Sequence, residues 1–280
     1  MKKHFLKSLC LSALFMAFSC QLGAQNYKFP FPSQQTIAKL KNSTTYIVLE
    51  GGMGSEFDVQ MKQNSKQYWT ITPYKIIDMD QYERLCKNPN NSFLMVVSGQ
   101  YTIFGKKIDV NLLTLVLGDK SGDINKMTDV MSVPLALLDE DGDSEEYGYK
   151  LGGIVRAMQY LLNNAPAEQD KGEHLKNLVH NNKNEIKNCK LLLTSEDLVK
   201  KEYSISQIET LYPYPFEIVE HDAIEQAVNR KDNACFCHII GMQNYCLKAV
   251  IHCADGKILY YNTSKETPVG LLKSDFQNLK

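Results

Sequence analysis

One stretch of the chain occurs twice. Residues 73–95 align with residues 215–237 without a gap, at a constant offset of 142, and five of the 23 positions are identical. The same order of elements is expected around both stretches: strand, helix, strand, helix, strand, strand. An internal repeat of this kind predicts a duplicated structural unit. The identical pairs are Pro73/Pro215, Ile76/Ile218, Asp80/Asp222, Glu83/Glu225 and Asn91/Asn233.

Apolar and β-branched runs predict strands, and apolar residues at helical spacing predict helices. In the first copy, strands are expected at 44–50, 74–77, 93–97 and 108–117, and helices at 55–68, behind Asp80 as a cap, and at 149–162. In the second copy, strands are expected at 189–193, 216–219, 234–240, 245–252 and 257–261, and helices at 195–209, behind Asp222 as a cap, and at 268–279.

Helices that alternate with strands, followed by a meander, indicate an α/β (α+β) fold. We expect two tandem similar domains over residues 44–163 and 189–280, each a mixed or antiparallel sheet with packed helices. Residues 164–188, dense in Asn, Lys, Glu and Gly, are interpreted as a linker. The Gly152-Gly153 pair inside a helical pattern is expected to allow close packing.

The first 24 residues have the layout of a secretory signal peptide. Three lysines precede an apolar run over residues 9–18, and small and polar residues then lead to Ala24, after which we expect cleavage. Lipoprotein processing at Cys20 is the alternative. Residues 25–43 are interpreted as an N-terminal linker. No other apolar stretch approaches the about 20 residues of a membrane-spanning helix, so the mature chain is expected to be exported, without a transmembrane segment, to the periplasm, the outer membrane or the medium.

The charges are balanced. The chain has 31 Lys and Arg residues against 32 Asp and Glu residues, a formal net charge of −1. This balance argues against a nucleic-acid partner, because such binding depends on neutralising phosphates. Six cysteines remain after the expected cleavage, and an oxidising compartment permits disulfides among them. They are Cys86, Cys189, Cys235, Cys237, Cys246 and Cys253.

The repeated unit has a recognisable pattern. A strand and a long helix precede an aromatic strand that runs into Ile76-Ile77-Asp78 or Ile218-Val219-Glu220, and a meander follows. This pattern resembles the N-terminal α/β domain of the Tol-system translocation protein and of curli-assembly lipoproteins. That resemblance implies a partner in the cell envelope. The segments 68–74 (YWTITPY) and 147–153 (YGYKLGG) also resemble exported proteins of Bacteroidota, a family that implies no particular activity.

Six carboxylates lie within residues 139–146. Calcium favours several oxygen ligands, and the carboxylates of Asp139, Asp141 and Asp143, at every second position, could converge on one ion. However, an EF-hand loop places Gly at its sixth position and Glu at its twelfth, and here Gly142 is fourth and Gly148 tenth. We therefore favour a solvated acidic turn over a calcium site.

Cysteines and histidines gather near the end of the chain. Cys235, Cys237 and Cys246 are expected to share one sheet face, with His238, His252 and Cys253 close by. Thiolate and imidazole ligands suit zinc, but two cysteines one residue apart on a strand both point into a core, where thiols behave as small apolar groups. We favour core cysteines or a disulfide.

The aromatic residues at the strand starts are interpreted as core, with an exposed binding patch as the alternative: Tyr68, Trp69, Tyr74, Tyr212 and Tyr214.

The sequence has no Gly-x-Ser-x-Gly elbow, no His-Glu-x-x-His and no phosphate-binding loop of the Gly-x-x-x-x-Gly-Lys-Ser/Thr type. We assign no catalytic, cofactor-binding or metal-ligating residue and expect no cofactor. The expected function is that of an exported, non-enzymatic binding or adaptor protein of the bacterial cell envelope, acting through protein–protein contacts. The alternative is a small exported hydrolase or metal-binding protein that uses the histidines and cysteines His221, His238, His252, Cys235, Cys237, Cys246 and Cys253. A third candidate is a structural surface protein.

Overall fold

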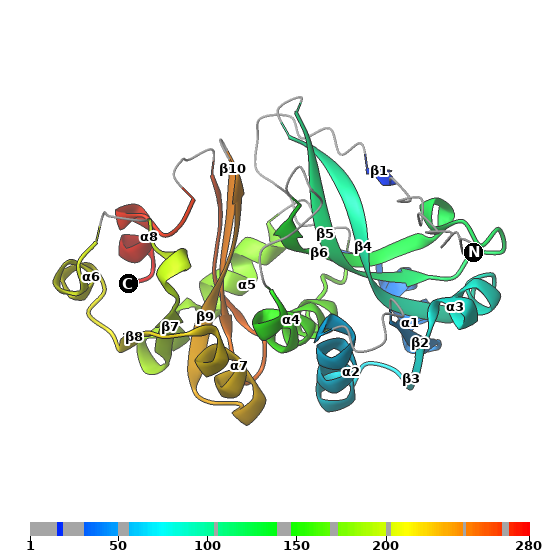
Figure 1. Ribbon diagram of the computed structural model, residues 1–280, viewed down its shortest axis with the longest axis horizontal. Coiled ribbons are helices and arrows are strands. Elements are labelled where there is room, and N and C mark those ends of the chain that lie inside the picture. The colour runs from blue at the N-terminus through cyan, green and yellow to red at the C-terminus, as the bar shows by residue number, and fades with distance from the viewer. Residues whose placement is uncertain are drawn as a thin grey trace, which may run out of the picture.

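Two sheets with their helices lie side by side in the computed structural model (Figure 1). The structure describes residues 16–18, 31–49, 56–103, 106–138, 147–168, 173–199, 203–242, 245–264 and 269–280. Most of the expected signal peptide, Gly51-Gly52 and the acidic stretch 139–146 lie outside these residues. Strand β1 (Met16–Phe18) falls within the expected signal peptide and pairs in parallel with Gly99–Tyr101.

The first sheet has the strand order β3-β2-β4-β5-β6. Strand β2 lies parallel to β3 and β4, whereas β4, β5 and β6 form an antiparallel meander. The sheet is therefore mixed. Its strands are β2 (Thr44–Val48), β3 (Tyr74–Ile77), β4 (Asn91–Ile103), β5 (Lys106–Leu117) and β6 (Thr128–Leu137).

The second sheet repeats this topology. Its order is β8-β7-β9-β10-β11, with β7 parallel to β8 and β9, and with β9, β10 and β11 antiparallel. The expected α/β class and the two tandem similar units are thus confirmed. The strands are β7 (Lys190–Leu193), β8 (Phe216–Ile218), β9 (Ala234–Met242), β10 (Tyr245–His252) and β11 (Ile258–Ser264).

The strand registers correct the alignment of the two copies. Thr45 lies opposite Tyr74, and Leu191 lies opposite Phe216, which keeps the offset of 142 at β3 and β8. The same two residues, Thr45 and Leu191, lie opposite Ser92 and Cys235, so the offset at β4 and β9 is 143. The sequence alignment misses this one-residue shift because it admits no gap.

Four helices connect the parallel strands of the two units: α2 (Glu56–Tyr68), α3 (Met79–Leu85), α6 (Ile205–Leu211) and α7 (His221–Arg230). Helix α3 begins with Asp78 as its N-cap in a capping box with Gln81, and α7 begins with Glu220 as its N-cap. Asp80 and Asp222, expected as caps, lie inside the first turn. A carboxylate there interacts favourably with the helix dipole.

The helix expected over 195–209 is wrong as a single element. The structure has a one-turn 3-10 helix there, η4 (Ser195–Asp197), and α6 begins only after its N-cap Ser204. The Asp197 carboxylate accepts the backbone N–H of Thr194, and Leu198 forms a parallel bridge with Leu271. These contacts hold residues 197–198 outside a continuous helix.

The two segments interpreted as linkers contain helices. Helix α1 (Gln34–Lys41) lies within 25–43, and α5 (His174–Asn182) and the 3-10 segment η3 (Lys183–Asn188) lie within 164–188. Leu175 of α5 joins the apolar core described below. At the other end, the expected helix 268–279 is shorter, because α8 spans Lys273–Asn278. No helix among the described residues is long and apolar enough to cross a membrane.

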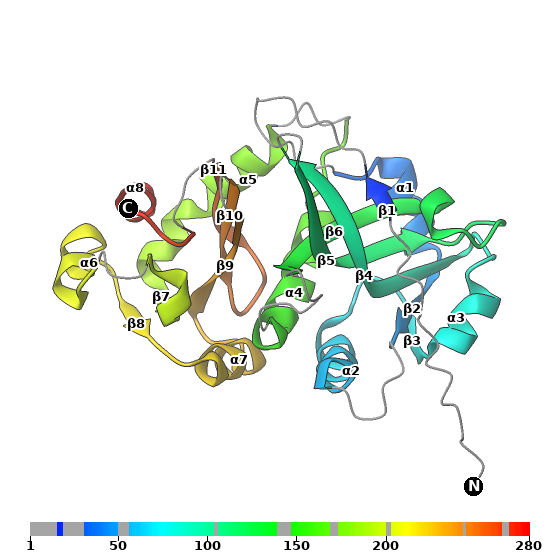
Figure 2. The same ribbon diagram turned by 45° about the horizontal axis from the view of Figure 1, so that its top comes forward.

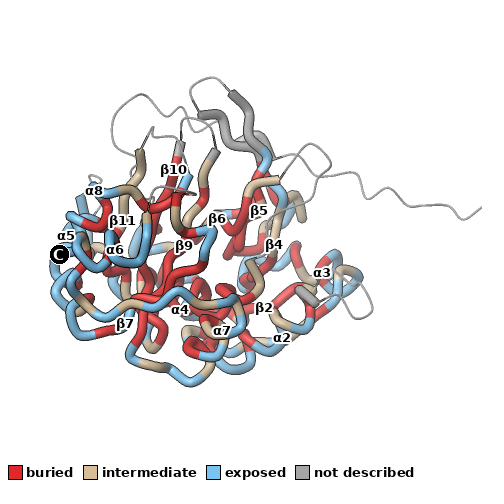
Figure 3. Tube along the Cα trace, turned by 60° about the vertical axis from the view of Figure 1, so that its left-hand side comes forward, coloured by how far each residue is buried: buried red, intermediate tan, exposed pale blue. Residues whose placement is uncertain are grey.

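Helix α4 (Leu151–Asn163) lies between the two sheets (Figures 1 and 2). Eleven of its residues are buried, and Figure 3 shows it inside the molecule. The largest apolar cluster, which we call the shared core, contains Ile154 and Met158 of α4 with residues of both sheets, such as Leu94 and Phe236. The two units are thus packed into one core, as the burial of apolar area favours.

Helix α2 of the first unit and α7 of the second line this shared core. Their repeat counterparts, α6 and α3, lie elsewhere: Ile208 of α6 joins a core specific to the second unit, and Tyr82 of α3 joins an outer core of the first. The units therefore pack through different faces, which is a heterologous contact.

Polar contacts also cross between the units. The Lys150 ammonium lies 3.6 Å from the Asp197 carboxylate, and both side chains are buried. Burial is the largest single influence on Lys150 and lowers its pKa, but Asp197, Tyr149 and Cys237 together raise the pKa by more, so it lies above its usual value. Farther along, the Arg156 guanidinium lies on the ring of Tyr68 (4.0 Å) and donates to the carbonyl oxygens of Val228 and Cys253.

We expect Gly153→Ala to destabilise the protein, although alanine is the better helix former. A Cβ atom at Gly153 would lie 2.4 Å from the Phe236 ring, so the helix or the ring must shift. The free energy of unfolding, measured in urea, should fall by about 1–3 kcal/mol. Asn163→Ala, at the exposed end of the same helix, is the control and should change it by less than about 0.5 kcal/mol. A gain in stability from Gly153→Ala would contradict the packing described.

Lys150→Met should lower the free energy of unfolding by about 3–5 kcal/mol, because the buried Asp197 carboxylate loses its counter-charge. Adding Asp197→Asn keeps an acceptor for the Thr194 N–H and should restore most of the loss. The exposed pair of Lys190 with Glu217 is the control, and Lys190→Met should cost about 0–1 kcal/mol. Equal losses at Lys150 and Lys190 would contradict a buried ion pair between the units.

Candidate functional site

The three histidines of the expected cluster lie in separate surroundings. The His221 ring stacks on Tyr149 with centroids 3.9 Å apart, and its Nε2 lies 2.8 Å from the Glu196 carboxylate. His252 has Nδ1 2.8 Å from Asp255, and this hydrogen bond raises the pKa of His252. His238 has Nε2 2.8 Å from the carbonyl oxygen of Pro134, in the other unit. Each ring is thus held by its own partner.

The cysteines of that cluster are spread along the strands. Cys235 lies opposite His252, whereas Cys246 lies opposite Gly241 at the far end of the same hairpin. Cys246 and His252 are six positions apart on β10, about 20 Å at 3.3 Å per residue. Within the described ranges, no group of three or more His, Cys, Asp or Glu side chains is placed to hold a metal ion.

Two sulfur atoms do come together. The Sγ atoms of Cys189 and Cys235 lie 3.2 Å apart, and both side chains are buried. Cys189 is not in the expected cluster, because 46 residues separate it from Cys235 in the sequence. The available signal is that both cysteines lie where expected strands begin; that these two strands are neighbours is shown by the structure.

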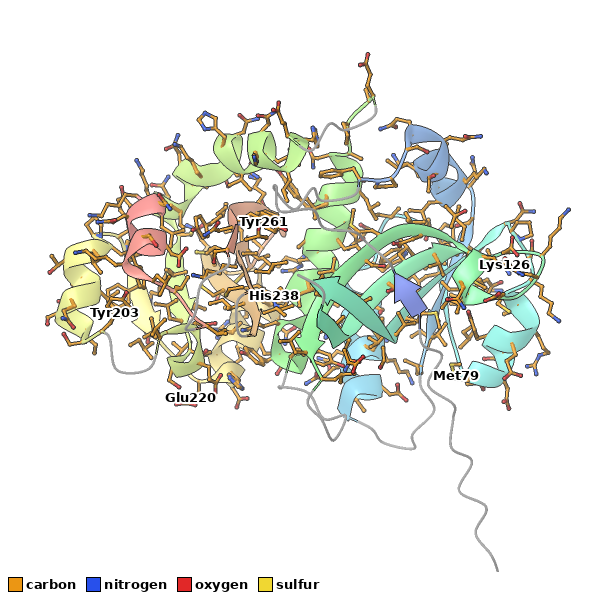
Figure 4. All side chains as sticks on the ribbon, turned by 90° about the horizontal axis from the view of Figure 1, so that it is seen from above. Met79, Lys126, Tyr203, Glu220, His238 and Tyr261 are labelled. Carbon is orange, nitrogen blue, oxygen red and sulfur yellow. The ribbon has the colours of Figure 1, made fainter. Side chains whose placement is uncertain are left out.

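An apolar cavity of about 50 Å³ lies between the two units. Side chains of β6, α4, α5, β9, β10 and β11 line it, among them Val133, Ile154, Leu175 and Tyr261. His238 contributes the imidazole of this lining. Figure 4 shows His238 and Tyr261 between the layers at the centre of the molecule. Such a space suits a small apolar group and excludes charged ligands.

Burial lowers the pKa of His238 to about 4, and the nearby Lys150 charge acts in the same direction, against the hydrogen bond to Pro134. The imidazole is therefore neutral at pH 7, and its Nε2–H donates to the Pro134 carbonyl. Because this nitrogen is hydrogen-bonded to the backbone of β6, His238 links β9 to β6 and has a structural role.

Strand β8 ends the second sheet, and no strand of the described residues pairs with its outer edge, which we call the open edge. Leu191 N–H donates to Pro215 O (3.0 Å) and Val219 N–H donates to Leu193 O (2.8 Å), so these residues face β7. Successive residues of a strand direct their backbone groups to opposite sides. The N–H and C=O groups of Phe216 and Ile218 therefore point away from the sheet.

A large apolar side chain is exposed on this edge strand, and another at the start of the helix that precedes it in the chain. Ile218 of β8 is 41% exposed and Ile205, at the start of α6, is 59% exposed. In the first unit, Ile76 on β3 is the repeat counterpart of Ile218 and is half-buried. Of the aromatic residues considered as a patch, Tyr68, Trp69 and Tyr212 are buried, which confirms them as core.

His238→Gln should flatten the pH dependence of stability on the acid side. In the unfolded chain a histidine binds its proton near pH 6.5, whereas His238 in the folded protein binds it near pH 4. The wild type therefore loses about 3 kcal/mol of unfolding free energy between these pH values, and no more from this group below them. Glutamine keeps a donor for Pro134 but does not titrate. Urea unfolding at pH 7 and pH 4 measures the difference.

His180→Gln, at an exposed position of α5, is the matched control and should leave the pH dependence as in the wild type. If His238→Gln loses as much stability on acidification as the wild type, His238 is not buried as a neutral group.

Comparisons with protein-family models, with curated proteins and with solved structures each returned no match.

Proposed function

We propose that this chain is an exported, non-enzymatic binding or adaptor protein of the bacterial cell envelope that acts through protein–protein contacts. The observation that carries the proposal is the open edge of β8, with the outward backbone groups of Phe216 and Ile218. An extended segment of a partner can add to such an edge as a further strand. Main-chain hydrogen bonds then supply affinity.

The exposed side chains at this edge indicate what the partner segment offers. Ile218 presents apolar surface, and Glu217 pairs with Lys190 at 3.0 Å across β8 and β7. A partner strand with an apolar residue opposite Ile218 would remove this surface from water, at about 25 cal/mol per Å². Long, apolar edge strands favour aggregation. Strand β8 is only three residues long, which limits that risk and still allows one partner strand to pair with it.

The alternative of an exported hydrolase or metal-binding protein requires its histidines and cysteines to converge. We rank it second because the registers separate Cys246 from His252, and because His221, His238 and His252 are each held by a different partner. Export and the envelope location are part of the proposal, and the charged and apolar pattern of the first 24 residues supports them.

Ile218→Pro should abolish partner binding without unfolding the protein. Proline removes the N–H that points away from β7, and it is tolerated where the N–H faces solvent on an edge strand. Wild-type protein with a C-terminal tag should capture a stoichiometric partner from native envelopes. Cross-linking of the captured complex should join the partner to β8. Capture by Ile218→Pro should fall at least about tenfold, a loss of about 1.4 kcal/mol.

Ile76→Pro is the matched control, because it makes the same change at the equivalent edge position of β3. It should capture the partner as the wild type does. A wild type that captures no partner, or an Ile218→Pro variant that captures it undiminished, would contradict the proposed docking edge.

A further inference from the structure

Cys189 and Cys235 lie on neighbouring strands of the second sheet, at the ends where β7 and β9 begin. Lys190 lies opposite Ala234, so the two cysteines flank the first paired residues of these strands. Their Sγ atoms are 3.2 Å apart, and they are 1% and 0% exposed. The sulfur atoms must approach by a further ~1.2 Å to reach the S–S bond length of about 2.05 Å, which requires rotation of the side chains and adjustment of the backbone where the strands begin.

The first unit holds a hydroxyl pair at the same place. The registers make Ser43 the counterpart of Cys189 and Ser92 the counterpart of Cys235. The Ser43 and Ser92 hydroxyls are 2.8 Å apart and hydrogen-bonded, in a buried site. Close approach of these two side chains is therefore a property of the repeated unit. The second unit differs by having sulfur where the first has oxygen, and only sulfur can form a bond there by oxidation.

We propose that Cys189 and Cys235 form a reversible disulfide that ties β7 to β9 when the chain meets a disulfide oxidant, such as glutathione disulfide or an oxidised dithiol protein. Cys189 is placed as the first nucleophile. A hydrogen bond from the Cys235 thiol lowers the pKa of Cys189 in spite of burial, and the nearby His252 charge acts in the same direction.

The reaction has two steps. Cys189 is buried and directly follows η3, so the oxidant reaches it when η3 moves away from the second unit or before η3 packs there during folding. The Cys189 thiolate then attacks one sulfur of glutathione disulfide, forming a mixed disulfide and releasing one glutathione thiolate. The Cys235 thiolate then attacks Cys189 Sγ, the mixed disulfide breaks, and the second glutathione leaves. The two protons of the protein thiols end on the two glutathione thiols. The protein is oxidised by two electrons and glutathione disulfide is reduced by two.

The test is oxidation of the full chain with glutathione disulfide, followed by alkylation under denaturing conditions and peptide mass mapping. Before alkylation we expect a mass about 2 Da lower than that of the reduced chain, and after alkylation and digestion one cross-linked peptide pair containing Cys189 and Cys235. The melting temperature should rise by about 5–10 °C on oxidation, because the bond closes a loop of about 45 residues.

The double variant Cys189→Ser/Cys235→Ser copies the Ser43–Ser92 pair of the first unit, and we therefore expect it to fold. It should show no oxidation-dependent rise in melting temperature. Cys237→Ser, at the next buried cysteine on the same face of β9, should keep the rise and the cross-linked peptide. Alkylation of both Cys189 and Cys235 after oxidation, or a disulfide that joins either one to another cysteine, would overturn the proposal.

Discussion

The packing of α4 between the two sheets is the constraint on which the rest of the structure depends. Because the helix contacts sheet residues on more than one side, it is buried over most of its length, and Gly152 and Gly153 let it approach α2 and Phe236 closely. Lys150, just before the helix, reaches Asp197, and Arg156 within it reaches Val228 and Cys253 of the second unit. Helix α4 of the first unit thus forms the main contact between the two units.

The two units share a topology but differ in chemistry. Equivalent positions hold Ser43 and Ser92 in one unit and Cys189 and Cys235 in the other. Leu113 of β5 corresponds to Lys248 of β10, which is fully buried with its ammonium 2.5 Å from Asp275. The two units also present different faces to the shared core, and Ile76 on β3 is half-buried where its counterpart Ile218 on β8 is exposed. A single docking edge in the second unit is consistent with this divergence.

Sequence patterns were sufficient for what depends on local spacing. They predicted the strand 74–77, the strand 245–252 and the repeat, because alternation and turn residues are local signals, and they left open whether each sheet is mixed or antiparallel. The cap at Asp78 was missed although its partner Gln81 is only three residues away, because Asp80 is an equally suitable cap by residue type. The end of η4 and the one-residue shift at β9 were missed because each depends on pairing with a distant residue. The proximity of Cys189 to Cys235 depends on the pairing of β7 with β9 inside the second unit, and that of Lys150 to Asp197 depends on how the two units pack.

The central claim, that both units are stabilised by one core around α4, is tested most directly by unfolding the protein and following each unit separately. Trp69, the only tryptophan, is buried in the first unit and reports its unfolding by fluorescence. Labelling of Cys237, which is fully buried in the second unit, reports the other. A shared core predicts that both signals change at the same urea concentration. Two separate midpoints would contradict it and would mean that the units fold independently.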